Sequence, residues 1–353
     1  SVGLDDVVYL SWVEPIGDGH ALRFSSWSDG HWATPKTVAE GDDWFVNWAD
    51  FPSMAALGDG TLAAHWLVRS GDVSHAYDIS IALSRDGGDT RSEPFHPHRD
   101  ATKTEHGFVS LVPFPEGHFG VIWLDGRQTA DTPRGAMTLR YATLSPDGRL
   151  AAEAEVDPSV CDCCSTDALR TGDGELLTVY RDRTASEVRD ISVAVLRASG
   201  WTAPRTVHGD NWIIAGCPVN GPAAASEGKT VAVAWFTGAD DTAGVEVAFS
   251  IDGGDTFGRP LRVDDGDPLG RVDVVMLDEG LAVVSWLERD ADQARVAIRS
   301  VAPSGISQFR FVTSTSPARS SGFPRMVTTG GETILAWTTA DEPTRIGTAV
   351  ITR

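Results

Sequence analysis

Several features are missing from this 353-residue sequence, and each absence narrows the class of protein. No stretch approaches the roughly 20 consecutive apolar residues of a transmembrane helix, so we expect no membrane span. Long helical periodicity is absent too, which argues against α and α/β folds. The four cysteines are too few for a fold built on disulfides.

Positive charge is also scarce. The chain has 29 basic against 50 acidic residues, a formal net charge of -21, which disfavours binding to nucleic acid and to anionic membranes. The first residues, SVGLDDVVYL, contain neither the basic nor the long apolar segment of a signal peptide. Together with many Asp-Gly turns, this favours a mature secreted or periplasmic protein whose signal peptide is not in the sequence.

An apolar strand that ends in an aromatic residue recurs seven times. Successive copies are 51 to 57 residues apart, and their aromatic residues are Trp12, Trp66, Trp123, Tyr180, Trp235, Trp286 and Trp337. Further short strands and tight turns surround each copy, giving about four strands in a unit of roughly 50 residues. The pattern predicts an all-β fold, a β-propeller of four-stranded blades that forms a single domain over residues 1–353.

Seven copies indicate seven blades, with six as the alternative. The first unit lacks its leading strand and the last lacks its fourth, so the ends of the chain are expected to complete each other. The turn between the third and fourth strands is nearly identical at residues 84–90 and 250–257, as SRDGGDT and SIDGGDTF. Glycine there permits positive φ, and Ser and Asp bind the turn's own amides, so we interpret these residues as structural.

The two SxDGGDT turns resemble the Asp-box (BNR) repeats of the sialidase-like β-propeller superfamily. The chain also resembles bacterial secreted sialidase-like proteins that carry a Cys-x-Cys-Cys segment. A sialidase would imply an arginine triad for the substrate carboxylate, a tyrosine nucleophile aided by a glutamate, and an aspartate acid/base. The Arg-Ile-Pro segment that opens sialidases is missing here.

The resemblance places a ligand site at one end of a central channel, formed by the loops that lead into and out of the inner strands. Aligning the repeats brings candidate groups for chemistry to these loops: Asp50, His106, Arg127, Arg271 and Arg325. Candidate substrate-binding residues are Trp48, Arg181 and Asn220. Converging arginines favour an anionic small molecule or a glycan as the ligand.

All four cysteines fall in the segments that lead into two consecutive repeats: Cys161, Cys163 and Cys164 in one, and Cys217 in the next. With His106 from the preceding repeat, they could bind copper or zinc. The alternative is a disulfide between Cys217 and one of the other three. Calcium is a weaker expectation, from the acidic turn at 264–267.

The stretch 96–100, His-Pro-His-Arg-Asp, is dense in polar groups just before a predicted strand. We expect His96 and His98 to be solvated histidines at the rim, and only His106 to reach the channel.

Two functional hypotheses follow. The first is an extracytoplasmic propeller with a cysteine-rich copper or zinc site, redox-active on a polar or anionic ligand as a metal-dependent oxidoreductase. The alternative is a sialidase-like glycan hydrolase or glycan-binding module in which the cysteines form a disulfide. A propeller that only binds other proteins is a third interpretation.

Overall fold

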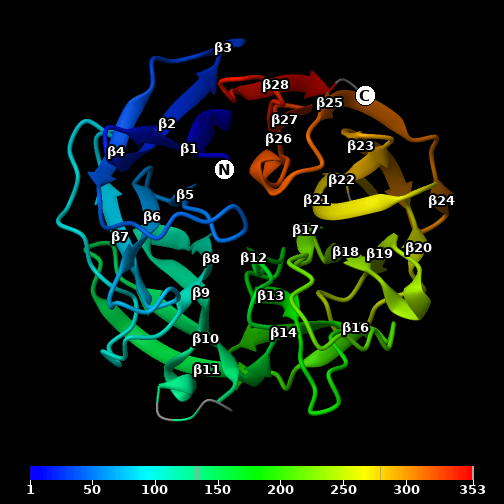
Figure 1. Cartoon of the computed structure of the whole chain (residues 1–353), viewed down its shortest axis with the longest axis horizontal. Helices are drawn as coiled ribbons and strands as arrows, with labels where there is room; N and C mark the ends of the chain where they lie inside the picture. Colours follow the sequence, from blue (N-terminus) through cyan, green and yellow to red (C-terminus); the bar gives the residue numbers. More distant parts are fainter. Residues whose placement is uncertain (131, 133–134, 279, 352–353) are drawn as a thin grey trace. The chain divides into compact units, whose positions relative to one another are not determined.

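The computed structural model describes residues 1–130, 132, 135–278 and 280–351, and these are almost entirely β-sheet. The chain divides into two compact units, Ser1–Val160 and Cys161–Arg353. The prediction of one domain over the whole chain stays a prediction. Figure 1 shows the strands of both units in chain order.

The first unit contains three antiparallel sheets. They are built from β1 (Val8–Ile16), β2 (Gly19–Ser28), β3 (His31–Trp32) and β4 (Lys36–Gly41); β5 (Ser53–Ala56), β6 (Leu62–Arg69) and β7 (Tyr77–Ser84); and β8 (His106–Pro113), β9 (Phe119–Asp125), β10 (Met137–Leu144) and β11 (Leu150–Val160).

The second unit contains four antiparallel sheets. They are built from β12 (Asp167–Arg170), β13 (Leu176–Arg181), β14 (Ile191–Arg197), β15 (Gly200–Trp201) and β16 (Arg205–His208); β17 (Ala223–Glu227), β18 (Thr230–Thr237), β19 (Gly244–Ser250) and β20 (Leu261–Arg262); β21 (Pro268–Asp278), β22 (Leu281–Asp290), β23 (Gln293–Ala302), β24 (Gly305–Ile306) and β25 (Arg310–Thr315); and β26 (Arg325–Thr329), β27 (Glu332–Thr338) and β28 (Ile346–Ile351).

Each predicted repeat forms one sheet, so the described residues make a propeller of seven blades with three to five strands each. This confirms the all-β prediction and decides for seven blades over six. The strands that were expected to be missing at the ends of the chain are missing. The first blade starts directly with β1, its aromatic-ending strand, which lies next to β2, and β2 pairs with both β3 and β4. The last blade has three strands.

The aromatic-ending strands of the five inner repeats form the core because sheets packed on both faces bury the side chains of their middle strands, whereas Trp12 and Trp337 in the first and last blades are half-buried. All seven residues of β9 are buried, and its Trp123 is completely inaccessible. Trp235 in β18 and Trp286 in β22 are equally enclosed. Continuous apolar runs, rather than alternating ones, are therefore the signal of these strands in the sequence.

The Asp-box turns have the structural role that the sequence predicted. After β7, the Asp86 carboxylate accepts hydrogen bonds from the Thr90 amide (2.9 Å) and hydroxyl (2.5 Å), while Ser84 Oγ accepts one from the Gly88 amide (2.8 Å). Gly88 has a φ of +89°, which few other residues tolerate. The turn after β19 repeats the same bonds.

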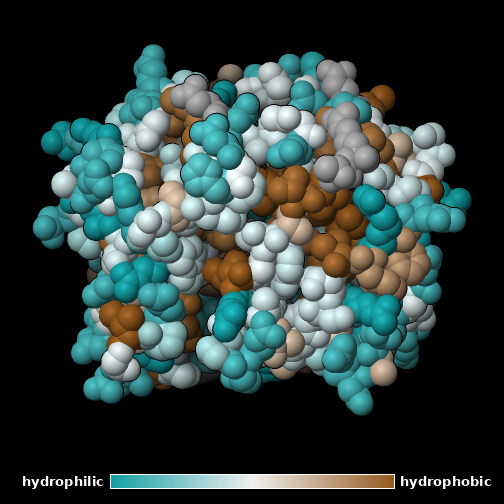
Figure 2. All heavy atoms as spheres, turned by 90° about the horizontal axis from the view of Figure 1, so that it is seen from above, coloured by the Kyte–Doolittle hydropathy of each residue, from teal (hydrophilic) through white to brown (hydrophobic). Residues whose placement is uncertain are grey.

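In the part of the chain that the structure describes, no helix is long and apolar enough to cross a bilayer. The face drawn in Figure 2 is mostly hydrophilic, with hydrophobic patches between polar residues, as a chain of net charge -21 would present. Net charge of this size favours solubility through mutual repulsion.

Candidate functional site

Three of the four cysteines lie in the turn that joins β11 to β12. Cys161 and Cys164 are buried and Cys163 is half-buried. The Cys161 sulfur lies 3.7 Å from that of Cys163 and 3.6 Å from that of Cys164, and all three sulfurs are within 4.8 Å of one another. A regular strand would point Cys164 away from the other two. The turn brings all three together.

Cys217 approaches this turn from the loop between β16 and β17. Its exposed sulfur lies 3.9 Å from Asp162 Oδ1, and the two residues group with Cys163 within 4.8 Å. Cys163 therefore belongs both to the three-sulfur set and to this outer set. All four cysteines are free thiols in this structure. We call these four residues the cysteine group.

Two buried arginines supply positive charge to the cysteine group. Arg189 Nη1 donates a hydrogen bond to the Cys161 sulfur at 3.2 Å, and only 4% of the Arg189 side chain is exposed. Hydrogen bonding with Cys163 and with Cys164, then the charge of Arg181, lowers the pKa of Cys161. Hydrogen bonding with Cys161 in turn raises the pKa of Cys163. Of these two thiols, Cys161 is therefore the one whose deprotonation the surroundings favour.

The spacing of the sulfurs suits a tetrahedral metal ion. Zinc–sulfur bonds of about 2.3 Å at tetrahedral angles place sulfur atoms roughly 3.8 Å apart. The distances of 3.6 and 3.7 Å from Cys161 to its two neighbours are close to this value. Thiolates also suit Cu(I), so the geometry accommodates either predicted metal.

His106, the predicted fifth ligand, begins β8 in the first unit, whereas the cysteine group belongs to the second. It is completely buried, and it contacts the carboxylates of Asp78, Asp100 and Asp125 and the Tyr77 carbonyl oxygen. Burial opposes a charge on this imidazole, but the three nearby carboxylates outweigh it and raise the pKa of His106 to about 10. That His106 binds a metal together with the cysteines stays a prediction.

The expectation that His98 is a solvated rim residue was wrong, because only 5% of its side chain is exposed. The segment after β7 folds back along that strand, through a bridge between Phe95 and Ile81, and carries His98 inward. Its ring stacks on His106 with centroids 4.0 Å apart and planes 2° from parallel. Burial, together with repulsion from His106, lowers the pKa of His98. His96 is exposed, as expected.

Asp50 and Asn220 link one repeat to the next. Asp50 Oδ1 accepts a hydrogen bond from the Phe108 amide at 2.8 Å, and Asn220 Oδ1 accepts one from the Arg271 amide at 2.7 Å. Both amide donors have positive φ and follow a glycine, at 107 and 270, whose missing side chain makes room for the side chain of the accepting residue.

Two further aspartates make comparable links in the second unit. Asp167 Oδ2 accepts from the Ala224 amide at 2.8 Å, and Asp273 Oδ2 accepts from the Met326 amide at 2.6 Å. We refer to Asp50, Asp167, Asn220 and Asp273 as the repeat links. Their position at the inner strands makes them look like ligand-facing groups in the sequence, but each accepts a backbone N–H of the next repeat.

Asp50 also belongs to a buried acid pair. The Tyr77 hydroxyl lies 2.8 Å from both Asp50 Oδ2 and Glu105 Oε1, and one phenol proton cannot serve two carboxylates. Burial raises the pKa of Asp50 to about 7, although the Phe108 amide and the Tyr77 hydroxyl lower it. Asp50 is therefore a group that changes charge near neutral pH.

The predicted anion-binding arginines have different surroundings. Arg127 forms ion pairs with Asp125 (2.7 Å), Glu153 (3.0 Å) and Asp100 (3.4 Å). Arg271 is buried and donates to Ser321 Oγ at 2.6 Å.

Arg325, with 41% of its side chain exposed, lies 3.5 Å from Asp273 Oδ1. Of the three arginines it is the most accessible.

Arg181 holds the backbone of its own unit together. Its guanidinium donates to the carbonyl oxygens of Arg189, Asn220 and Phe236 at 2.6 to 3.0 Å and lies over the Trp212 ring at 4.9 Å. It is buried, whereas Trp48, the predicted stacking platform, is half-buried. Roles for both in substrate binding stay predictions.

No protein-family model matches the chain, and no curated protein does. Solved structures do match. The Hadza microbial sialidase Hz136 is 14% identical with a TM-score of 0.57, over 96% of this chain and 74% of its own. The leech intramolecular trans-sialidase is 11% identical with a TM-score of 0.57, over 86% and 68%.

The α-L-arabinanase of Penicillium chrysogenum is 13% identical with a TM-score of 0.56, over 88% of this chain and 95% of its own. Such low identities establish a common fold and not a common chemistry. The chain therefore has the β-propeller fold of these proteins, which confirms the predicted resemblance to sialidase-like propellers at the level of architecture.

Proposed function

We propose that this protein is a metal-binding propeller that acts outside the cytoplasm, and that its cysteine group binds Cu(I) or Zn²⁺. One observation carries the proposal: three unbridged sulfurs, those of Cys161, Cys163 and Cys164, converge within 4.8 Å at metal-ligand spacing. Buried arginines next to them offset the negative charge that thiolate ligands bring.

The cysteine group has an inner and an outer part. Cys161 and Cys164 are buried, Cys163 is half-buried, and Cys217 is exposed beside Asp162. An ion bound by the inner three would keep one side directed toward Cys217 and solvent. That side could accept a fourth protein ligand or a polar molecule, which is what redox chemistry at copper would need.

The first test is elemental analysis of the full chain purified without a chelating column, together with a count of free thiols after denaturation. We expect about one equivalent of copper or zinc that is lost in a Cys161→Ser/Cys163→Ser double variant. Cys217→Ser is the matched control for a cysteine outside the inner three, and it should retain most of the metal.

Equal metal content in the wild type and the double variant, with two or fewer free thiols in the wild type, would contradict the proposal. The cysteines would then be a disulfide clamp, as in the alternative prediction.

A glycan-active function is the second candidate, because sialidases and an arabinanase share the fold. Asp50, with a pKa of about 7, could transfer protons, and Arg325 could contact an anionic sugar. Two features weigh against it: Asp50 is only 2% exposed, and Arg127 already pairs with three carboxylates. Assays on sialosides and arabinan oligosaccharides would detect this activity directly.

A further inference from the structure

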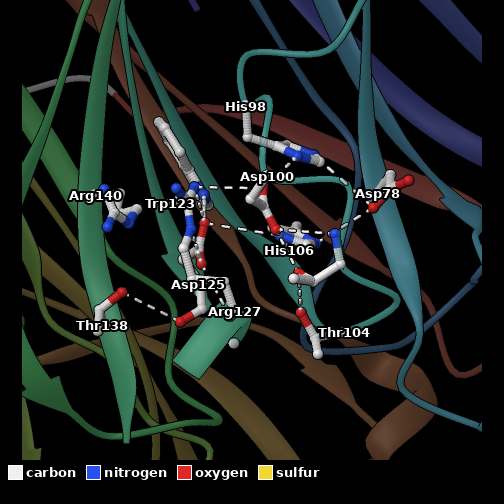
Figure 3. Close-up of polar contacts among 12 residues, drawn as sticks. Asp78, His98, Asp100, Thr104, His106, Trp123, Asp125, Arg127, Thr138 and Arg140 are labelled. Atoms are coloured by element: carbon white, nitrogen blue, oxygen red, sulfur yellow. Dashed lines mark hydrogen bonds and ion pairs between the residues drawn. The ribbon is translucent and has the colours of Figure 1, made fainter. Parts of the chain in front are cut away.

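A second cluster of metal-ligand side chains lies in the first unit, away in sequence from every cysteine. It consists of Asp78 on β7, His98 and Asp100 in the segment that follows, and His106 at the start of β8, and we call it the histidine group. Figure 3 shows the two imidazoles with Asp78 and Asp100 beside them.

Asp100 contacts both imidazoles and so fixes their orientation. Its Oδ1 lies 3.2 Å from His98 Nδ1, and its Oδ2 lies 3.2 Å from His106 Nε2. The opposite nitrogens of the two rings therefore point elsewhere. Both approach the same atom: Asp78 Oδ1 is 3.3 Å from His106 Nδ1 and 3.9 Å from His98 Nε2. His106 Nδ1 also lies 3.3 Å from the Tyr77 carbonyl oxygen, a contact that a bound ion would replace.

Two of these atoms are buried without a hydrogen bond among the described residues, namely His98 Nε2 and Asp78 Oδ1. Asp78 Oδ1 is at ion-pair distance from His106, yet it accepts no directed hydrogen bond there. Buried polar atoms in folded proteins are nearly always satisfied, so a facing pair of unsatisfied ones requires a reason. A ligand between them would supply it.

We propose that Asp78 Oδ1, His98 Nε2 and His106 Nδ1 bind a divalent transition-metal ion such as Zn²⁺. Two imidazoles and a carboxylate are a familiar ligand set for such ions. Bonds of about 2.0–2.1 Å at tetrahedral angles place ligand atoms roughly 3.3 Å apart, close to the observed 3.3 and 3.9 Å. Because an imidazole binds a metal in its ring plane, the two stacked rings, now 2° from parallel, would tilt apart when the ion binds.

Asp100 then has the role of the outer carboxylate. Metal-bound histidines usually donate their second ring N–H to a carboxylate or carbonyl, which fixes the tautomer and the ring. Here one carboxylate does so for both rings, at equal distances of 3.2 Å. A pair of histidines that merely filled the core would not need this arrangement.

The charges around the group also suit a cation. Asp78, Asp100 and Asp125 all lie within 4 Å of an imidazole nitrogen. Arg127 pairs with Asp100 and Asp125 but not with Asp78, which among the described residues has only the two histidines as ionic partners. A divalent ion would neutralise Asp78 where no arginine or lysine does.

Access to the group is from the side of Asp78. The side chains of His98 and His106 are 5% and 0% exposed, whereas that of Asp78 is 26% exposed. An ion could therefore enter past a partly solvated carboxylate and come to rest against two enclosed imidazoles, which is a plausible entrance for a metal site.

The test separates this site from the cysteine group by removing the thiols. A variant with all four cysteines changed to serine is stripped with a chelator and dialysed against Zn²⁺ and, separately, Co²⁺. We expect about one equivalent of bound Zn²⁺, a rise in Tm on adding it, and a Co²⁺ spectrum without thiolate charge-transfer absorption.

On that background, His98→Gln and the near-isosteric Asp78→Asn should weaken Zn²⁺ binding at least tenfold and abolish the rise in Tm. His96→Gln is the matched control, because His96 lies two residues from His98, is exposed and is outside the ligand set. Near-UV circular dichroism without metal checks that each variant is folded.

If the cysteine-free protein does not fold, the same three substitutions are made in the wild type. There Asp78→Asn and His98→Gln should each remove one equivalent of Zn²⁺ and leave the thiolate charge-transfer absorption of Co²⁺ unchanged. Equal Zn²⁺ binding by Asp78→Asn, His98→Gln and His96→Gln in either background would overturn the proposal. Loss of the thiolate absorption in Asp78→Asn or His98→Gln would overturn it too, because the lost metal would then have been bound by the cysteine group.

Discussion

The cysteine group and the histidine group are electrostatic opposites. In the former, Arg181 and Arg189 place positive charge beside Cys161 and lower its pKa. In the latter, three aspartates place negative charge around His106 and raise its pKa. The arginines favour anionic ligands in one group, and the aspartates favour a cation in the other.

The two groups also differ in how the chain assembles them. Three of the cysteines lie within four consecutive residues, so a single turn creates most of the site. The histidine group needs β7, the segment after it and the start of β8 to fold together. The first should therefore tolerate changes elsewhere in the fold better than the second, and the following predictions test this difference.

The largest effect is expected at Asp125, which is fully buried beside the histidine group. Its carboxylate accepts hydrogen bonds from Trp123 Nε1 (2.7 Å) and twice from the Arg127 guanidinium (2.7 Å each). Asp125→Ala removes the acceptor of Trp123 Nε1 and Arg127 Nε in a buried site and should lower the free energy of unfolding by about 3 kcal/mol or more, measured by urea denaturation.

Glu153→Ala is the control, since Glu153 pairs with the same Arg127 but is 21% exposed. It should cost less than about 1 kcal/mol. If the two variants lost equal free energy of unfolding, burial would not determine how much a carboxylate beside Arg127 contributes to stability.

A pH-dependent effect comes next, at Asp50. Because its pKa is raised to about 7 by burial, the folded protein holds this proton more tightly than the unfolded chain does. The stability that this proton provides is present at acid pH and is lost as the pH rises toward 7. Relative to Asp50→Asn, the wild type should lose roughly 3 kcal/mol between pH 4.5 and 7.5.

Urea denaturation of both proteins at several pH values measures this difference. The asparagine can still accept from the Phe108 amide and can donate to the Tyr77 oxygen, so the fold should persist. A stability difference that does not change with pH would mean that Asp50 is ionised in the folded protein throughout this range.

The smallest effect is expected at Arg189, in the cysteine group. Arg189→Met removes the guanidinium that lies 3.2 Å from the Cys161 sulfur, while it keeps much of the side-chain volume. Without this charge, thiolate ligands are less stable, and metal affinity should fall about tenfold, or about 1.4 kcal/mol. Competition with a chromophoric chelator measures it.

Arg183→Met is the matched control, because Arg183 is a nearby arginine that pairs with Glu187 at 2.7 Å and lies 3.8 Å from Asp162. If both variants lose affinity equally, general charge rather than the contact with Cys161 supports the site.

The fold was predictable from the sequence because it repeats. Seven apolar strands at regular spacing indicate the same blade seven times, and two SxDGGDT turns indicate the same turn twice. A wrong assignment of strands in one repeat is therefore recognised by comparison with the others. Even the incomplete first and last blades could be inferred from strands missing in the pattern.

The sites were predictable only in part. The clustering of Cys161, Cys163 and Cys164 is visible in the sequence, but their convergence depends on a turn where strand alternation would have separated them. His98 was assigned to the rim because nothing local indicates that its segment folds back along β7. Nothing in the sequence indicated that Asp162 and Arg189 contact the cysteine group.

The repeat links have a consequence for how the chain would open. Each joins the backbone of one repeat to a side chain of the preceding one, through the amides of Phe108, Ala224, Arg271 and Met326. These four protons should exchange with solvent deuterium only when neighbouring repeats separate. Their exchange rates would therefore report, within each unit, which neighbouring blades separate first.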